Sequence, residues 1–218
     1  MFTGIVNGTG IVKSISRAKK KYHDTLMSVY LGSYSRNLRT GDSVSIDGTC
    51  LTVTSLRNHT ATFEIVGETI ERTTFREIEK GDRVNVERSL KLKDRLEGHM
   101  VLGHVDGVGE IVEIIKSEEG VKMWIRITDS KMKKYIVPKG SVTVDGISLT
   151  VVDVSQNKFS IALVPHTILK TTLGSKIRGQ HVNIEYDILS KYIDKLLFYH
   201  KQRNYPKISK TYNSTPMQ

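Results

Sequence analysis

The sequence predicts an all-β protein of two tandem, homologous, six-stranded antiparallel β-barrels, followed by one C-terminal α-helix. Three observations carry this prediction: an internal repeat, an alternation of apolar and polar residues with a period of two, and an apolar stripe of helical period near the end. The chain has 218 residues, which is enough for two small domains that each bury a core.

The repeat is visible at a shift of 98 residues. The segment GDSVSIDGTCLTV at 41–53 aligns with KGSVTVDGISLTV at 139–151, and GDRVNVE at 81–87 aligns with GQHVNIE at 179–185. A solenoid has many short repeats, whereas this chain has only two copies and each is much longer than a solenoid unit. Each copy is therefore expected to fold as a domain. The expected division is a first barrel at 1–97, a second barrel at 98–187, a helix at 188–203 and a tail at 204–218.

The strand prediction rests on alternation within each copy. Apolar residues alternate with serine or threonine in the runs SVSI at 43–46 and SVTV at 141–144. An Asp-Gly pair follows each run, and this is the strongest short signal for a tight hairpin. Closing such strands into a barrel removes the exposed sheet edges. Between strands, Asp129 is expected to cap a short helix at 130–136.

The last predicted element is a helix with an apolar stripe. Five apolar residues fall at i, i+3, i+4, i+7 and i+8, namely Leu189, Tyr192, Ile193, Leu196 and Leu197. The first copy has no counterpart of similar length, so the stripe must pack on the chain's own barrels or on other subunits. The tail at 204–218, rich in Lys, Ser, Thr and Asn, is expected to be basic and disordered.

The net charge of +10 raises the question of a nucleic-acid partner. Half of that charge lies from Lys191 onward, and the rest of the chain shows no basic stripe interleaved with aromatic residues. A tandem barrel that binds single-stranded nucleic acid would therefore rest on charge alone, and we expect no such partner. No apolar run is long enough for a membrane helix, and the start is unlike a secretory signal. A single cysteine, Cys50, excludes a disulfide framework, so a cytoplasmic location is expected.

Five motifs, in order along the chain, resemble those of riboflavin synthases, the family of duplicated lumazine-binding barrels. They are MFTGIV at 1–6, CLTV at 50–53, NVER at 85–88, GHMVLGH at 98–104 and DGISLTV at 145–151. The resemblance extends to about Asp187. It implies a transferase of riboflavin biosynthesis that moves a four-carbon unit between two molecules of 6,7-dimethyl-8-ribityllumazine. The implied products are riboflavin and 5-amino-6-ribitylamino-pyrimidinedione.

The same resemblance implies the partners of the chain. It implies no metal and no cofactor, because the lumazine ring itself can act as the electron sink. It further implies a homotrimer joined by the C-terminal helices, with each active site between the N-terminal barrel of one subunit and the C-terminal barrel of a neighbour. An association with lumazine synthase is left open.

Three residues are expected to take part in catalysis: Ser148, His104 and Cys50. The Ser148 hydroxyl can bond to the edge of the ring or polarise water, and serine is a poor strand former, so a functional reason is favoured. His104 is a candidate base for the acidified 7-methyl group of the lumazine, because imidazole titrates near neutrality. A structural histidine is nearly as good an explanation. A lone cysteine usually fills a core, so Cys50 is expected to line the pocket without forming a covalent bond.

A larger set is expected to contact the substrate. These residues are Phe2, Thr3, Gly4, Val6, Ser43, Thr52, Gly67, Thr69, His99, Lys139, Asp145, Thr150, Val164, His166, Thr167 and Asp187. Thr150 could instead reflect strand propensity alone, and Lys139 or Asp187 could equally belong to a surface ion pair. His99 and His104 are an odd number of residues apart, so they need not point the same way. Too few other ligands surround them for a metal site.

The alternative function is that of a non-catalytic relative. Lumazine proteins share the fold and bind one lumazine or flavin without converting it. Such duplicates lose one pocket, whereas here both hairpin motifs and Ser148 are present, which favours the enzyme. The copies also differ, as donor and acceptor pockets should, at the aligned pairs Cys50 and Ser148, Gly67 and Pro165, and Glu68 and His166.

Overall fold

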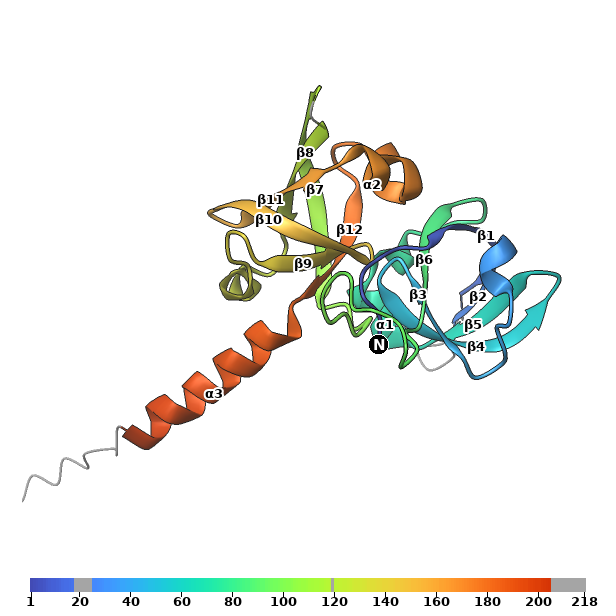
Figure 1. The fold of residues 1–218 in the computed structure, drawn as a ribbon, viewed down its shortest axis with the longest axis horizontal. Helices are drawn as coiled ribbons and strands as arrows, with labels where there is room; N and C mark the ends of the chain where they lie inside the picture. Colours follow the sequence, from blue (N-terminus) through green and yellow to red (C-terminus); the bar gives the residue numbers. More distant parts are fainter. Residues whose placement is uncertain (18–24, 119, 205–218) are drawn as a thin grey trace, which may run out of the picture.

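The computed structural model describes residues 1–17, 25–118 and 120–204, with side chains up to residue 200. It contains two closed six-stranded antiparallel barrels and a C-terminal helix, which confirms the predicted fold class (Figure 1). The predicted disordered tail lies outside the described residues from 205 onward.

The first six strands form the N-barrel, in which neighbours around the barrel are β1, β2, β5, β4, β3 and β6. The strands are β1 (Gly8–Ser16), β2 (Thr25–Tyr30), β3 (Ser43–Ile46), β4 (Thr49–Arg57), β5 (Thr60–Ile65) and β6 (Arg83–Arg88). Short helices connect them: η1 (Gly32–Ser35), α1 (Gly67–Arg72) and η2 (Thr74–Arg76).

The next six strands form the C-barrel, and their pairing repeats that of the N-barrel. The strands are β7 (Gly107–Ser117), β8 (Gly120–Ile127), β9 (Ser141–Val144), β10 (Ile147–Ser155), β11 (Lys158–Leu163) and β12 (His181–Tyr186). The short helices are η3 (Ser130–Tyr135), α2 (Pro165–Lys170) and η4 (Thr172–Ser175). Asp129 caps η3 as predicted, because its carboxylate accepts the Lys131 N–H at 3.0 Å, although η3 is a 3-10 helix.

The two Asp-Gly hairpins form as predicted, between β3 and β4 and between β9 and β10. Asp47 and Gly48 have φ of 44° and 81°, and Asp145 and Gly146 have φ of 45° and 81°. Two consecutive positive φ angles define the tight turn whose twist matches that of the flanking strands. The alternation then holds one side chain in two inside each barrel, as in β4 and β10.

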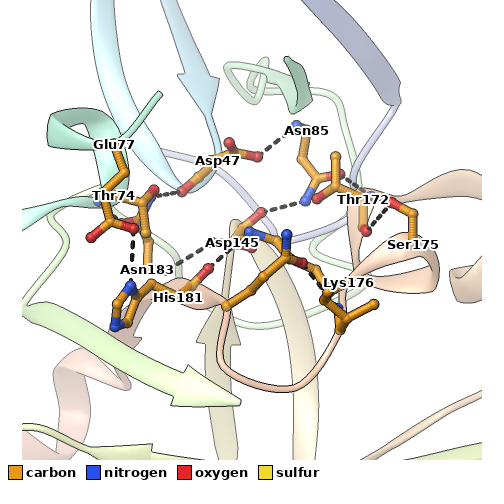
Figure 2. Close-up of polar contacts among 12 residues, drawn as sticks. Asp47, Thr74, Glu77, Asn85, Asp145, Thr172, Ser175, Lys176, His181 and Asn183 are labelled. Atoms are coloured by element: carbon orange, nitrogen blue, oxygen red, sulfur yellow. Dashed lines mark hydrogen bonds and ion pairs between the residues drawn. The ribbon is translucent and has the colours of Figure 1, made fainter. Parts of the chain in front are cut away.

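The barrels are joined by a pair of equivalent asparagines on β6 and β12. The Asn85 amide donates to the Asp145 carbonyl at 2.9 Å, and the Asn183 amide donates to the Asp47 carbonyl at 2.8 Å (Figure 2). The oxygens of the same two amides accept backbone N–H groups from the opposite barrel, at 2.8 Å in each case. Each asparagine therefore fixes a hairpin and a short helix of the other barrel.

Two carboxyl groups are buried in this network. Asp47 and Asp145 each accept a backbone N–H at 2.7 Å, from Asn85 and Asn183 respectively. Burial, and then the charge of Asp145, raise the pKa of Asp47 well above its ordinary value. Burial also raises the pKa of Asp145, although the Lys176 ammonium at 3.5 Å opposes this. The folded chain therefore binds protons at this pair of carboxyl groups more readily than the unfolded chain does.

We expect the replacement Asp47→Asn to weaken the pH dependence of folding stability. Because the pKa of Asp47 is raised in the folded protein, the free energy of unfolding falls as the pH rises above the ordinary value of 3.8. Asparagine keeps the acceptor for the Asn85 N–H and carries no charge. Urea unfolding at about pH 5 and about pH 7 should show a smaller loss for the variant than for the unmodified chain.

Asp153→Asn is the matched control for this measurement. Asp153 is exposed, and its hydrogen bond to Lys122 lowers its pKa, so this carboxylate is ionised in both states over that pH range. Its replacement should leave the pH dependence as it was. If Asp47→Asn also leaves the pH dependence unchanged, the pKa of Asp47 is not raised on folding.

The C-terminal helix α3 (Ile188–Asn204) runs away from both barrels (Figure 1). Its apolar stripe is uncovered, because Leu189, Tyr192, Ile193, Leu196 and Leu197 are each between 52% and 68% exposed. The stripe therefore does not pack on the chain's own barrels, which was one of the two expected possibilities. Within the described part of the chain, no helix is both long and apolar enough to cross a membrane.

Candidate functional site

Two segments that precede the barrels each run along the hairpin of the other barrel. In segment 1–6, the Gly4 carbonyl accepts the Ser148 N–H at 2.8 Å, and in segment 98–104, the Gly103 carbonyl accepts the Cys50 N–H at 2.8 Å. A Cβ at Gly4 or Gly103 would lie 2.6 Å from the Cβ of Ser148 or Cys50, so only glycine allows this approach. Segment 1–6 therefore reaches Ser148, whereas the 98–104 linker reaches Cys50 through Gly103 and Ser148 through His99.

Two buried glutamates hold these segments in place. Glu87 accepts the backbone N–H groups of Thr3 at 2.7 Å and Gly4 at 3.0 Å. Glu185 does the same for Leu102 and Gly103 at 2.7 and 2.9 Å. Burial raises the pKa of both glutamates, and the backbone donors oppose the shift. Both glutamates occupy equivalent positions in the aligned repeats, although neither is among the predicted site residues.

The C-barrel group is centred on Ser148 at the start of β10. The Ser148 hydroxyl lies 2.7 Å from Nδ1 of His99, whose Nε2 lies 3.1 Å from the hydroxyl of Thr143 on β9. The His99 backbone N–H donates to the Thr3 carbonyl at 3.1 Å. Burial lowers the pKa of His99, and the charge of Asp187 opposes the shift. A neutral imidazole therefore links two hydroxyls, and one of them belongs to Thr143, which is not among the predicted site residues.

The other predicted residues of the C-barrel lie on several elements. Thr150 is exposed two positions after Ser148 on β10, so both side chains lie on the same face of the strand. Val6 packs on the core of the C-barrel. The remaining residues are the exposed Lys139 in the turn before β9, the exposed Val164 before α2, His166 and Thr167 within α2, and Asp187, whose carboxylate accepts the Leu189 N–H at the start of α3.

The N-barrel group surrounds a cavity of about 300 Å³. Cys50, Thr69 and His104 line it, together with Thr49 and Thr73 and with neighbours from α1 and the linker. This cavity brings two of the three predicted catalytic residues together, Cys50 and His104.

The other predicted residues of the N-barrel lie on β3, β4 and α1. Ser43 and Thr52 are paired across β3 and β4, and Gly67 begins α1. His99 and His104 thus serve different groups, in agreement with their odd spacing.

Two predicted contact residues point elsewhere. Phe2 is fully buried and pairs with Val101, so it anchors segment 1–6. The carboxylate of Asp145 is bound within the contact between the barrels, to the Asn183 N–H and beside Lys176. Among residues 1–17, 25–118 and 120–204, no cluster of three or more His, Cys, Asp or Glu side chains is arranged to hold a metal ion.

Comparison with known proteins matches both halves of the chain to one family. The lumazine binding domain matches residues 3–89 and again 102–187. Riboflavin synthase from Actinobacillus pleuropneumoniae is 40% identical over 198 residues, which cover 90% of each chain. The riboflavin synthase of Escherichia coli is 40% identical over 187 residues, 86% of this chain and 87% of that one. The Bacillus subtilis enzyme is 37% identical over 90% of each chain.

Solved structures show the same fold at lower identity. LumP complexed with riboflavin superimposes with a TM-score of 0.78 at 27% identity and covers 85% of this chain and 99% of LumP. LumP complexed with 6,7-dimethyl-8-(1'-D-ribityl) lumazine gives 0.76 at 26% identity, with the same coverage. Sequence identity is thus higher to the synthases than to LumP. The chain belongs to the riboflavin synthase family and is built from two lumazine-binding domains.

Proposed function

We propose that the chain is a transferase that converts two molecules of 6,7-dimethyl-8-ribityllumazine into riboflavin and 5-amino-6-ribitylamino-pyrimidinedione. One observation carries this proposal: each chain contains two equivalent hairpin sites whose side chains differ. Ser148 with His99 occupies the C-barrel site, and Cys50 with His104 occupies the N-barrel site. A reaction between two copies of one substrate needs two sites that bind the same molecule. Because one copy donates the four-carbon unit and the other accepts it, the side chains around the two copies must differ.

Most of the rate advantage would come from positioning. Two rings held in contact react as if within one molecule, which can lower the barrier by up to about 7–11 kcal/mol. In this scheme His104 takes the proton from the 7-methyl group, Ser148 bonds to the ring or to a reacting water, and Cys50 lines the pocket. Thr52, Thr69, Thr150, Thr167 and His166 would contribute further polar contacts around the two rings.

The two sites that react together belong to neighbouring subunits in this proposal. Within one chain Ser148 and Cys50 lie on different barrels, and their backbone N–H groups are bound by different segments, at Gly4 and Gly103 respectively. The exposed stripe of α3 supplies an apolar face for association. We therefore propose a homotrimer in which α3 helices pack together and the N-barrel of one subunit faces the C-barrel of the next. With one cysteine, the chain suits the reducing cytoplasm.

Titration with riboflavin distinguishes this function from the binding-protein alternative. Because both hairpin sites keep their polar side chains, calorimetry should give two binding sites per chain with unequal affinities. Ser148→Ala should weaken one of the two and leave the other. One site per chain in the unmodified protein would favour a non-catalytic lumazine or flavin carrier, whose second pocket has been lost.

A further inference from the structure

We infer that Thr143 is a positioning residue that holds His99 in its Nδ1–H tautomer, so that Ser148 keeps its own proton for the ligand. The three side chains form one linear chain of contacts. Thr143 Oγ1 lies 3.1 Å from His99 Nε2, and His99 Nδ1 lies 2.7 Å from Ser148 Oγ. The positions of the protons along these contacts decide whether the Ser148 hydroxyl donates a hydrogen bond to a ligand or accepts one from it.

The imidazole carries a single proton. Burial disfavours its charged form and lowers the pKa of His99, and the charge of Asp187 opposes this only in part. One ring nitrogen therefore donates and the other accepts. Two arrangements remain, one with the proton on Nδ1 beside Ser148 and one with the proton on Nε2 beside Thr143.

The burial of Thr143 separates the two arrangements. Thr143 is 1% exposed, on a strand whose neighbours Val142 and Val144 are fully buried. Among the contacts of the described residues, the one hydrogen-bond acceptor for its hydroxyl proton is His99 Nε2. If Nε2 carried the proton, the Thr143 proton would be buried without an acceptor. That cost corresponds to about tenfold or more in the tautomer ratio.

The favoured arrangement gives a hydrogen-bond partner to both ring nitrogens of His99 and to the Thr143 hydroxyl. Thr143 donates to Nε2, and Nδ1–H donates to Ser148. Ser148 is half-buried at the start of β10, so its own O–H is left to donate into the site. His99 consequently does not act as a base on Ser148. Ser148 presents a hydrogen-bond donor, which suits a carbonyl oxygen or an unprotonated ring nitrogen of the ligand. This last step rests on the proposed function, whereas the tautomer does not.

Among the described residues of the N-barrel, no contacts equivalent to the linked Thr143, His99 and Ser148 side chains are formed. The residue aligned with Thr143 is Ser45, which is also buried, and the residue aligned with Ser148 is Cys50. No histidine bonds to Ser45 or Cys50 among the described contacts, since His104 instead lines the adjacent cavity. The linked Thr143, His99 and Ser148 side chains thus give the C-barrel site a fixed hydrogen-bond donor that the N-barrel site does not share. Because Ser45 is aligned with Thr143 but has no such histidine contact, Ser45→Ala is a matched control.

The test is the ¹⁵N NMR spectrum of histidine-labelled full-length protein, with the His99 signal identified by its loss in His99→Gln. The unmodified chain should show His99 protonated at Nδ1. Thr143→Val should shift the tautomer ratio toward Nε2–H by about tenfold, and Thr143→Ser should restore it. Ser45→Ala should leave the His99 signal unchanged.

Two results would overturn the inference: an Nε2–H tautomer in the unmodified chain, which needs no variant to observe, or an unchanged ratio in folded Thr143→Val. Turnover gives the link to function. The kcat of Thr143→Val should fall by about tenfold, and Thr143→Ser should recover most of the loss. If the tautomer ratio responds to Thr143→Val as expected but the chain makes no riboflavin, the role of Thr143 stands and the proposed function is wrong.

Discussion

Deletion of residues 188–218 should give a folded, monomeric protein whose turnover is lower by at least about 100-fold. The reason lies in α3. Its apolar stripe is exposed, and the two buried cores consist of barrel residues alone, so its loss should spare the barrels. Without neighbours, the N-barrel and C-barrel sites of different subunits no longer meet. Sedimentation velocity, circular dichroism and riboflavin absorbance measure the three expected results.

A shorter deletion is the control for this experiment. Removal of residues 205–218 leaves α3 whole and should change neither assembly nor turnover. A protein that stays trimeric without residues 188–218 would show that α3 does not form the interface between subunits. A monomer with full turnover would show that the reacting sites lie within one chain.

The second large effect should separate Ser148 from its aligned counterpart Cys50. Ser148→Ala should lower turnover by about 10- to 100-fold, because it removes a donor to the ligand and leaves the buried His99 Nδ1–H without its acceptor. Cys50→Ala should cost less, because it trims a weakly hydrogen-bonding side chain from a pocket wall. Steady-state kinetics on both variants, with assembly checked by sedimentation, makes the comparison. If Cys50→Ala is the more damaged enzyme, the thiol takes part in the chemistry.

Much of the fold followed from local patterns. The Asp-Gly turns need positive φ at two consecutive residues, and these residue types adopt it easily, so the hairpins at Asp47 and Asp145 could be placed from sequence. Because the two copies align, each strand or turn predicted in one barrel was also expected at the aligned position in the other. The apolar stripe likewise placed the last helix, because its period is a property of the segment itself.

The candidate site was less accessible, because it is made by contacts between distant segments. The exchange of segments 1–6 and 98–104 depends on Glu87 and Glu185, whose carboxylates bind backbone groups that no side-chain pattern reveals. The direction of a side chain at a turn is equally hidden. Asp145 was expected at the ligand, whereas its carboxylate is bound between the barrels. The signal that could have found Thr143 and both glutamates is their place in the aligned repeats.

The most direct test of the central claim is incubation of the purified chain with 6,7-dimethyl-8-ribityllumazine as the sole organic reactant. Because one substrate molecule donates four carbons to the other, riboflavin should appear at half the molar amount of lumazine consumed. The pyrimidinedione should appear in equal amount to riboflavin. Lumazine that is bound but not consumed, with no riboflavin formed, would contradict the enzyme and leave a binding protein.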